Sequence, residues 1–145
     1  ATDPGLSDLD AVLVDVPCTG TGTLRRHPDA RWRLRISDVA MLPLTQREIL
    51  DGAASCVRVG GLVIYSTCSV ETEENDDVVA AFLARHPDWV LEAAPEGAVP
   101  AAVRDVLTPT PGHPAAGAAT GAVLRVLPQR HGADGAFAAR LRRVR

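Results

Sequence analysis

The chain has 145 residues, 46% of them hydrophobic and 23% charged, with a formal net charge of −3, a balance that fits one soluble globular domain. No apolar run approaches the roughly 20 residues that a transmembrane helix needs, so we expect no membrane partner. Three cysteines at unrelated spacings exclude both a disulfide framework and a C-x-x-C zinc pattern, and without a signal peptide we expect a cytoplasmic location.

The first predicted element is a strand at residues 11–16, a run of apolar and β-branched side chains interrupted by Asp15. Such a run is typical of a strand buried on both faces of a parallel sheet. Pro17 ends the strand because proline has no amide hydrogen to donate to the ladder. In the following loop, Gly20 and Gly22 resemble a phosphate-binding loop only weakly, since a third glycine and a following lysine are missing. A flexible turn is the simpler interpretation.

A basic segment follows the loop. All fifteen basic residues are arginines, and five of them stand within eleven positions: Arg25, Arg26, Arg31, Arg33 and Arg35. Because arginine binds phosphate bidentately, the segment predicts contact with an RNA backbone, and the alternative is an ordinary solvated face. Trp32, within the segment, either stacks on a base or packs against the protein.

A helix is predicted at about residues 42–59. Its apolar face has Leu50 at the edge and contains Leu42, Ile49, Ala53, Cys56 and Val57. Cys56 is therefore interpreted as a small core residue without chemistry. Gly60 and Gly61 are expected to end the helix at a left-handed cap. A short strand at residues 62–66 then runs into a polar turn that carries Cys68.

A second helix is predicted at residues 73–85, capped by Thr72, with Glu73 and Glu74 favoured near its positive N-terminus. Strands are expected at residues 89–91 and 122–127. Between them, residues 94–120 form an irregular connection with one helical turn near 101–106. The last segment, residues 135–144, is either a helix or an edge strand.

The order strand, helix, strand, helix, strand predicts an α/β fold with a parallel sheet and right-handed crossovers. Cys18 and Cys68 then follow neighbouring strands at the carboxyl edge of the sheet, where open α/β sheets bind their ligands. Adjacent strands lie about 4.8 Å apart, so the two thiols are expected to face one pocket.

Several short motifs stand in a distinctive order along the chain. They are D-x-P-C at residues 15–18, R-R-H-P-D at 25–29, W-R at 32–33, L-T-Q-R-E-I-L at 44–50, T-C-S-V at 67–70 and E-E-N at 73–75. Together with Pro128, His131 and Asp134-Gly135, they resemble RNA cytosine-5 methyltransferases of the bacterial Fmu/Sun family over nearly the whole chain. A single cysteine near a strand end is usually a small buried hydrophobe, but the two motifs together are far more specific.

The resemblance implies S-adenosylmethionine-dependent methylation of cytosine carbon 5 in RNA, with rRNA as the expected substrate. Cys68 is by resemblance the nucleophile, which adds to carbon 6 and so activates carbon 5. Cys18 is the second cysteine, which assists loss of the carbon-5 proton and release of product. Asp15 is expected to contact the base ring and, with Pro17, the cofactor. The expected RNA contacts are Arg25, Arg26, His27, Arg31 and Arg33.

The resemblance also implies a Rossmann-like methyltransferase fold, with a mostly parallel sheet, helices on both faces and an antiparallel last strand. The family's glycine-rich cofactor loop should precede the first strand, and the ten residues before that strand are too few to supply it. We therefore expect residues 1–145 to be the C-terminal part of one catalytic domain. On their own they should bind S-adenosylmethionine weakly or not at all and should not turn over.

Other interpretations of these residues remain open. Cys18 and Cys68 could form a disulfide, which a cytoplasmic setting disfavours. With His27 they could bind a metal or make a Cys–His hydrolase, although the spacings match no familiar ligand pattern, and we expect no metal. A hypothesis of another class is a non-catalytic RNA-binding or scaffolding protein that keeps the motifs.

Overall fold

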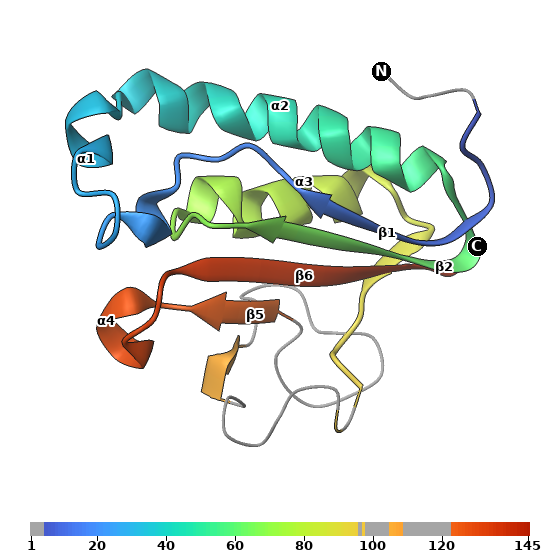
Figure 1. Cartoon of the computed structure of the whole chain (residues 1–145). Helices are drawn as coiled ribbons and strands as arrows, with labels where there is room; N and C mark the ends of the chain where they lie inside the picture. The colour runs from blue at the N-terminus through green and yellow to red at the C-terminus, as the bar shows by residue number, and fades with distance from the viewer. Residues whose placement is uncertain (1–4, 96, 98–104, 109–122) are drawn as a thin grey trace.

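The computed structural model describes residues 5–95, 97, 105–108 and 123–145, whose arrangement is shown in Figure 1. The strands are β1 (Leu9–Asp15), β2 (Val57–Thr67), β3 (Trp89–Leu91), β4 (Leu107–Thr108), β5 (Val123–Val126) and β6 (Ala136–Arg143). The helices are α1 (Ala30–Arg33), α2 (Ile36–Ser55), α3 (Asp76–Arg85) and α4 (Pro128–His131), with short 3-10 turns η1 (Thr21–Thr23) and η2 (Thr72–Glu74). In this part of the chain, no helix combines the length and apolar character needed to cross a membrane.

The six strands form one mixed sheet in the order β1-β2-β6-β5-β4, and β3 also pairs with β6. β1 and β2 are parallel, whereas β6 is antiparallel to β2, β3 and β5, and β4 is antiparallel to β5. Four strands therefore run in one direction, and β6 and β4 run in the other. The α/β fold and the antiparallel last strand are confirmed. That strand is central and not at an edge, because it pairs with β2, β3 and β5.

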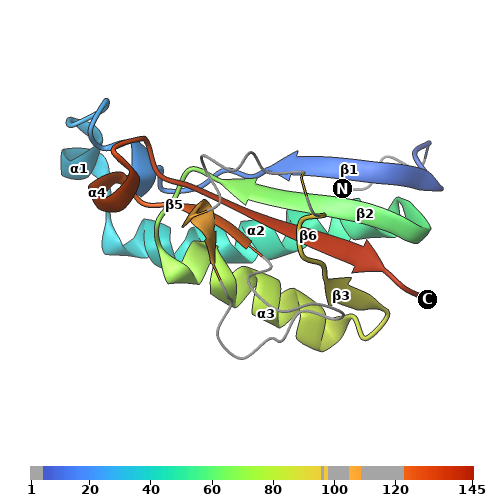
Figure 2. The same cartoon turned by 90° about the horizontal axis from the view of Figure 1, so that it is seen from below.

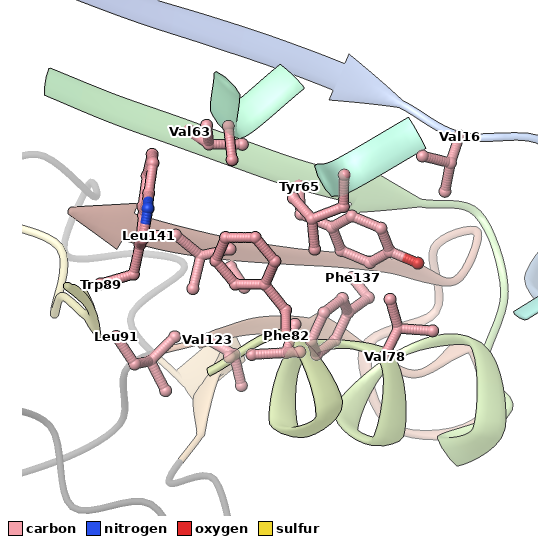
Figure 3. Close-up of a cluster of buried hydrophobic side chains, with 14 of the residues drawn as sticks. Val16, Val63, Tyr65, Val78, Phe82, Trp89, Leu91, Val123, Phe137 and Leu141 are labelled. Atoms are coloured by element: carbon pink, nitrogen blue, oxygen red, sulfur yellow. The ribbon is translucent and has the colours of Figure 1, made fainter. Parts of the chain in front are cut away.

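Both long helices pack on the same face of the sheet. The core that they cover contains Tyr65 from β2, Phe82 from α3, and Phe137 and Leu141 from β6, as Figure 3 shows. On the opposite face, Leu13 of β1 is 68% exposed. In the described residues, both long helices therefore lie on one face of the sheet. The expectation that β1 is buried on both sides is wrong, since none of its residues is fully buried.

The boundary between α2 and β2 differs from the prediction. α2 begins at Ile36 and not near residue 42, because the Asp38 carboxylate accepts a hydrogen bond from the Arg35 amide at 2.9 Å and closes the first turn. β2 already begins at Val57, which pairs with Leu9. Gly60 does have a left-handed φ of 78°, but it lies inside β2 where the register with β1 shifts. It therefore forms a strand irregularity and not a helix cap.

The buried face of α2 is also rotated from the predicted one. Its buried residues are Pro43, Gln46, Leu50 and Ala54. Leu50 is thus central and not at the edge, and a search for apolar residues alone misses the polar Gln46. Cys56 is only half-buried, at the end of the helix, where its thiol donates to the Gly52 carbonyl at 3.5 Å. The interpretation of Cys56 as a core residue is wrong.

The second predicted helix is divided into η2 and α3. Asn75, and not Thr72, precedes the first turn of α3, and the acids in that turn are Asp76 and Asp77. The strands expected at residues 89–91 and 122–127 are confirmed by β3 and β5, although residue 122 is outside the described residues. The helical turn near 101–106, and most of the irregular connection at 94–120, also lie outside them.

Candidate active site

The carboxyl ends of β1 and β2 lie at the same end of the sheet, where the chain leaves each strand toward α1 or α3 (Figure 1; Figure 2). Sγ of Cys18, three residues beyond β1, lies 3.3 Å from Sγ of Cys68, the residue directly after β2. Both cysteines are free, and their separation is a hydrogen-bond contact, well beyond the roughly 2.05 Å of a disulfide bond. The parallel pairing therefore brings the two predicted site cysteines into direct contact.

The two thiols have different surroundings. Cys68 is exposed, while Cys18 is half-buried. Burial, and then the hydrogen bond with Cys68, raises the pKa of the Cys18 thiol to about 12. Cys18 is therefore a neutral thiol at physiological pH, and Cys68 is the sulfur that an incoming ligand reaches.

The turn that carries Cys68 is fixed by Asn75, which is fully buried. The side-chain oxygen of Asn75 accepts a hydrogen bond from Thr67 Oγ1 at 2.7 Å, and its Nδ2 donates to the Ser69 carbonyl at 3.0 Å. The Ser69 amide also donates to Thr67 Oγ1 at 3.2 Å. Both chain neighbours of Cys68 are thus held, which fixes the backbone from which the thiol projects.

Glu74, whose side chain is also fully buried, joins the loop of Cys18 to the turn of Cys68. Its carboxylate accepts hydrogen bonds from the Thr19 amide at 2.9 Å, from Thr19 Oγ1 at 2.5 Å and from Gln46 Nε2 at 3.0 Å. Thr19 Oγ1 also lies 3.3 Å from Ser69 Oγ. Because Thr19 follows Cys18 and Glu74 belongs to η2, this carboxylate connects the two loops that carry the cysteines.

Gln46 and Tyr65 extend this polar network into the core. Gln46 Nε2 donates to the Pro17 carbonyl at 2.9 Å, and Tyr65 Oη donates to the Glu74 carbonyl at 2.6 Å. Burial, together with the charge of Glu74, raises the pKa of the Tyr65 hydroxyl, which keeps it a donor. One set of buried hydrogen bonds therefore holds α2, β2 and the loops after both strands.

Gly22 lies between two stretches of backbone. Its amide donates to the Cys68 carbonyl at 3.0 Å, and its carbonyl accepts from the Gly135 amide at 2.8 Å. A Cβ at this position would lie 2.6 Å from the Cys68 carbonyl oxygen and 2.7 Å from Gly135 Cα. The second glycine of the Gly20-x-Gly22 pattern is thus required for close packing beside Cys68, so the interpretation as a flexible turn is wrong.

Asp15 and Pro17, the expected cofactor contacts, are exposed at the carboxyl end of β1. Asp15 Oδ1 accepts a hydrogen bond from Ser66 Oγ at 3.2 Å. A carboxylate has about four lone-pair sites, so this bond leaves acceptor capacity for a bound group. The carbonyl of Pro17 is used by Gln46, whereas its ring faces solvent at the same end of the sheet.

The residues expected to bind RNA (Arg25, Arg26, His27, Arg31 and Arg33) are all exposed. Two of them fasten the basic segment to the loop before β6. Arg26 Nε forms an ion pair with Asp134 Oδ2 at 2.8 Å, and Arg25 Nη1 donates to the Gly132 carbonyl at 3.0 Å. Contact of these side chains with RNA stays a prediction.

No role was predicted for Gln46, Thr19 or Asn75, and Glu74 was expected only to favour the positive N-terminus of a helix. A signal for Gln46 was present, since it stands one helical turn before Leu50 on the same face. The contacts of Glu74 and Asn75 join residues far apart in the chain, which periodicity does not detect. Among the residues that the structure describes, no group of three or more His, Cys, Asp or Glu side chains is placed to hold a metal ion.

The chain is similar to several known proteins. A family model described as 16S rRNA methyltransferase RsmB/F matches residues 2–142. The Mycobacterium tuberculosis (strain H37Rv) protein Rv1407 is 44% identical over 142 residues, which cover 98% of this chain and 27% of that protein. Ribosomal RNA small subunit methyltransferase B of Sodalis glossinidius is 46% identical over 92 residues, which cover 63% of this chain and 21% of that protein.

Among solved structures, NSun6 from Pyrococcus horikoshii with SFG matches with a TM-score of 0.71 and 26% identity, over 96% of this chain and 31% of that one. The chain thus spans about a quarter of the length of the curated relatives it matches.

Proposed function

The chain belongs to the family of 16S rRNA methyltransferases RsmB/F, and on this basis we propose that it carries the catalytic cysteines of an enzyme that methylates carbon 5 of cytosine in RNA, with S-adenosylmethionine as the methyl donor. One observation carries the proposal: two free thiols lie 3.3 Å apart at the carboxyl ends of adjacent parallel strands. The relative from Sodalis glossinidius is named a ribosomal RNA small subunit methyltransferase, which supports rRNA as the substrate.

Cys68 is the proposed nucleophile because it is exposed and stands on a turn held on both sides. Carbon 5 of cytosine is a poor nucleophile toward a methyl group on a sulfonium ion. When the Cys68 thiolate adds to carbon 6, its electron pair forms the S–C bond, and the displaced ring electrons make carbon 5 nucleophilic. S-adenosylmethionine, when bound, supplies an electrophilic methyl group to that carbon.

Cys18 acts in the second half of the proposed reaction. The carbon-5 proton must leave and the S–C6 bond must break, so that the C5=C6 double bond forms again. As a neutral thiol 3.3 Å from Cys68 Sγ, Cys18 can give its proton to the departing sulfur. In the same step the carbon-5 proton passes to the Cys18 sulfur while its C–H electron pair forms the C5=C6 double bond and the S–C6 electron pair returns to Cys68, so that both cysteines end as thiols.

Asp15 and Pro17 are the proposed contacts of this chain with the cofactor, and Asp15 also with nitrogen 3 of the base ring. The free acceptor capacity of the exposed Asp15 carboxylate fits such a contact. NSun6 from Pyrococcus horikoshii was solved with SFG, an analogue of S-adenosylmethionine, which supports this cofactor class. The exposed Arg25, Arg26, His27, Arg31 and Arg33 are proposed to contact RNA phosphates.

Residues 1–145 are proposed to form the C-terminal part of one catalytic domain. The match to Rv1407 supports this division, since it covers 98% of the chain but only 27% of that protein. Within this part, the two cysteine loops meet on one polar network, so both sulfurs are supplied by a single structural unit.

The test of this function is the product. The protein, at its full natural length, should convert cytidine to 5-methylcytidine in 16S rRNA with S-adenosylmethionine, as read by mass spectrometry of the digested nucleosides. Cys68→Ala should form no 5-methylcytidine. A different methylated nucleoside, or 5-methylcytidine formed by Cys68→Ala at the rate of the unchanged protein, would contradict the proposal.

A further inference from the structure

Trp32 is a large aromatic side chain that packs against nothing in the core. It is 83% exposed, whereas the other tryptophan, Trp89, is 5% exposed and packs edge-on against Phe82 at 5.5 Å. No residue of α1, the four-residue helix that carries Trp32, is buried. The sequence left open whether Trp32 stacks or packs, and among the residues that the structure describes nothing buries it. The exposed indole offers an aromatic face on which a planar ligand can stack.

The surroundings of Trp32 are cationic. The Arg31 guanidinium carbon lies 5.7 Å from the centroid of the Trp32 ring, a cation–π contact. Residues 24–38 contain five arginines and two aspartates, although the net charge of the whole chain is −3. An aromatic face beside arginines attracts a ligand that is both planar and anionic. Nucleotides combine these two properties, since a base stacks while its phosphate binds the cations.

The segment that carries Trp32 is fastened to the cysteine site by a series of contacts. Arg26 forms an ion pair with Asp134 at 2.8 Å. Gly135, which follows Asp134, donates its amide hydrogen to the Gly22 carbonyl at 2.8 Å. The Gly22 amide in turn donates to the Cys68 carbonyl at 3.0 Å. Both views place α1 at the end of the sheet where β1 and β2 finish (Figure 1; Figure 2). Trp32 therefore lies at the end of the molecule that holds the two thiols.

We propose that Trp32 is a stacking platform for an unpaired base of the RNA, outside the position of the target cytosine. This inference rests on the proposed function, and it adds a recognition site to that function. Stacking is tolerant of sequence because every base has a π-face, so Trp32 should add affinity for a single-stranded or extruded segment with little preference among the four bases. A protein partner is the competing occupant of this surface, but the five arginines favour an anionic ligand such as RNA.

The test uses the protein at its full natural length and a single-stranded RNA that contains the target cytosine, with 2-aminopurine placed at one flanking position at a time. Stacking on Trp32 should quench 2-aminopurine emission at one or two neighbouring positions. Trp32→Leu should remove this quenching and weaken RNA binding by roughly tenfold, whereas Trp32→Phe should keep most of both. Val144→Ala removes an exposed apolar side chain at the opposite end of the sheet and should change neither.

The outcomes separate this inference from the proposed function. At subsaturating RNA, Trp32→Leu should form 5-methylcytidine more slowly, in proportion to its weaker RNA binding, because the platform supplies affinity and not chemistry. If the unchanged protein methylates the RNA, but Trp32→Leu binds the RNA and quenches 2-aminopurine as well as the unchanged protein does, the stacking platform is overturned and the proposed function is not. The platform is also overturned if Trp32 is buried against another part of the full-length protein. In that case a soluble quencher would not reach the Trp32 fluorescence even without RNA. Absence of 5-methylcytidine from the unchanged protein is a failure of the proposed function.

Discussion

Cys18 and Cys68 lie 3.3 Å apart but are not equivalent, since one is half-buried and the other exposed. The pKa of the Cys18 thiol rises from its usual 9.0 to about 12, first through burial and then through the hydrogen bond with Cys68. The folded protein thus holds this proton more tightly than the unfolded chain does. The resulting contribution to stability is complete below pH 9 and is lost as the pH rises toward 12.

The two thiols should therefore differ in their rates of alkylation. With iodoacetamide near pH 8, Cys68 should be modified at least about tenfold faster than Cys18, because the thiolate is the reactive form and Cys18 is almost wholly protonated. Peptide mass spectrometry over time measures both rates. In Cys68→Ala the hydrogen bond to Cys18 is absent, so Cys18 should react faster than in the unchanged protein. Faster alkylation of Cys18 than of Cys68 would contradict the raised pKa of the Cys18 thiol.

At the scale of elements, the short turn η2 matters more than its three residues suggest. Its Glu74 accepts three hydrogen bonds from Thr19 and Gln46, so it joins α2 to both cysteine loops. A fully buried acceptor of this kind leaves its donors unpaired when it is removed, and each unpaired buried donor costs about 1–3 kcal/mol.

Glu74→Ala should therefore lower the free energy of unfolding by about 2–5 kcal/mol and slow methylation, because Thr19 and the neighbouring Cys18 lose their anchor. Glu73→Ala, one residue earlier and exposed, is the matched control and should stay within about 0.5 kcal/mol of the unchanged protein. Urea denaturation followed by circular dichroism measures both values. Equal stabilities for the two variants would show that the Glu74 contacts do not hold the loops together.

The elements that the sequence could predict are those with a local signal. β1 is an apolar run ended by Pro17, and β2 is one ended by a polar turn, which was enough to bring Cys18 and Cys68 together. The buried face of α2 was missed because a search for apolar residues passes over Gln46, and the partners of Gln46, the Pro17 carbonyl and Glu74, are about 30 residues away in the chain. The early start of β2 was missed because Gly60 has the backbone of a helix cap but lies within a strand.

At the scale of the whole molecule, the long helices that the structure describes cover one face of the sheet. The described residues place both long helices on the side of Tyr65 and Leu141, and Leu13 on the other side is 68% exposed. Helices on both faces are expected of the complete domain by resemblance and not from any pattern in these 145 residues, and the described residues contribute both of their long helices to one face. The central place of β6 follows from pairing across long sequence distance, as with Phe137 opposite Thr67, and has no local signal either.

The cofactor contacts proposed for this chain are few, namely Asp15 and Pro17. Residues 1–145 alone should therefore bind S-adenosylmethionine with a Kd no tighter than about 1 mM, since small interaction surfaces give little affinity. The protein at its full natural length should bind it in the micromolar range. Isothermal titration calorimetry of the two compares them directly. Micromolar binding by residues 1–145 would show that this part holds most of the cofactor site.

The most direct test of the assignment of Cys68 is a covalent trap. In RNA whose target cytosine is replaced by 5-fluorocytosine, carbon 5 has no proton to lose, so the S–C6 bond formed by the nucleophile cannot be released after methyl transfer. With S-adenosylmethionine, the full-length protein and its Cys18→Ala variant should each form a protein–RNA adduct that survives a denaturing gel, and Cys68→Ala should form none. An adduct that persists in Cys68→Ala would show that another residue is the nucleophile.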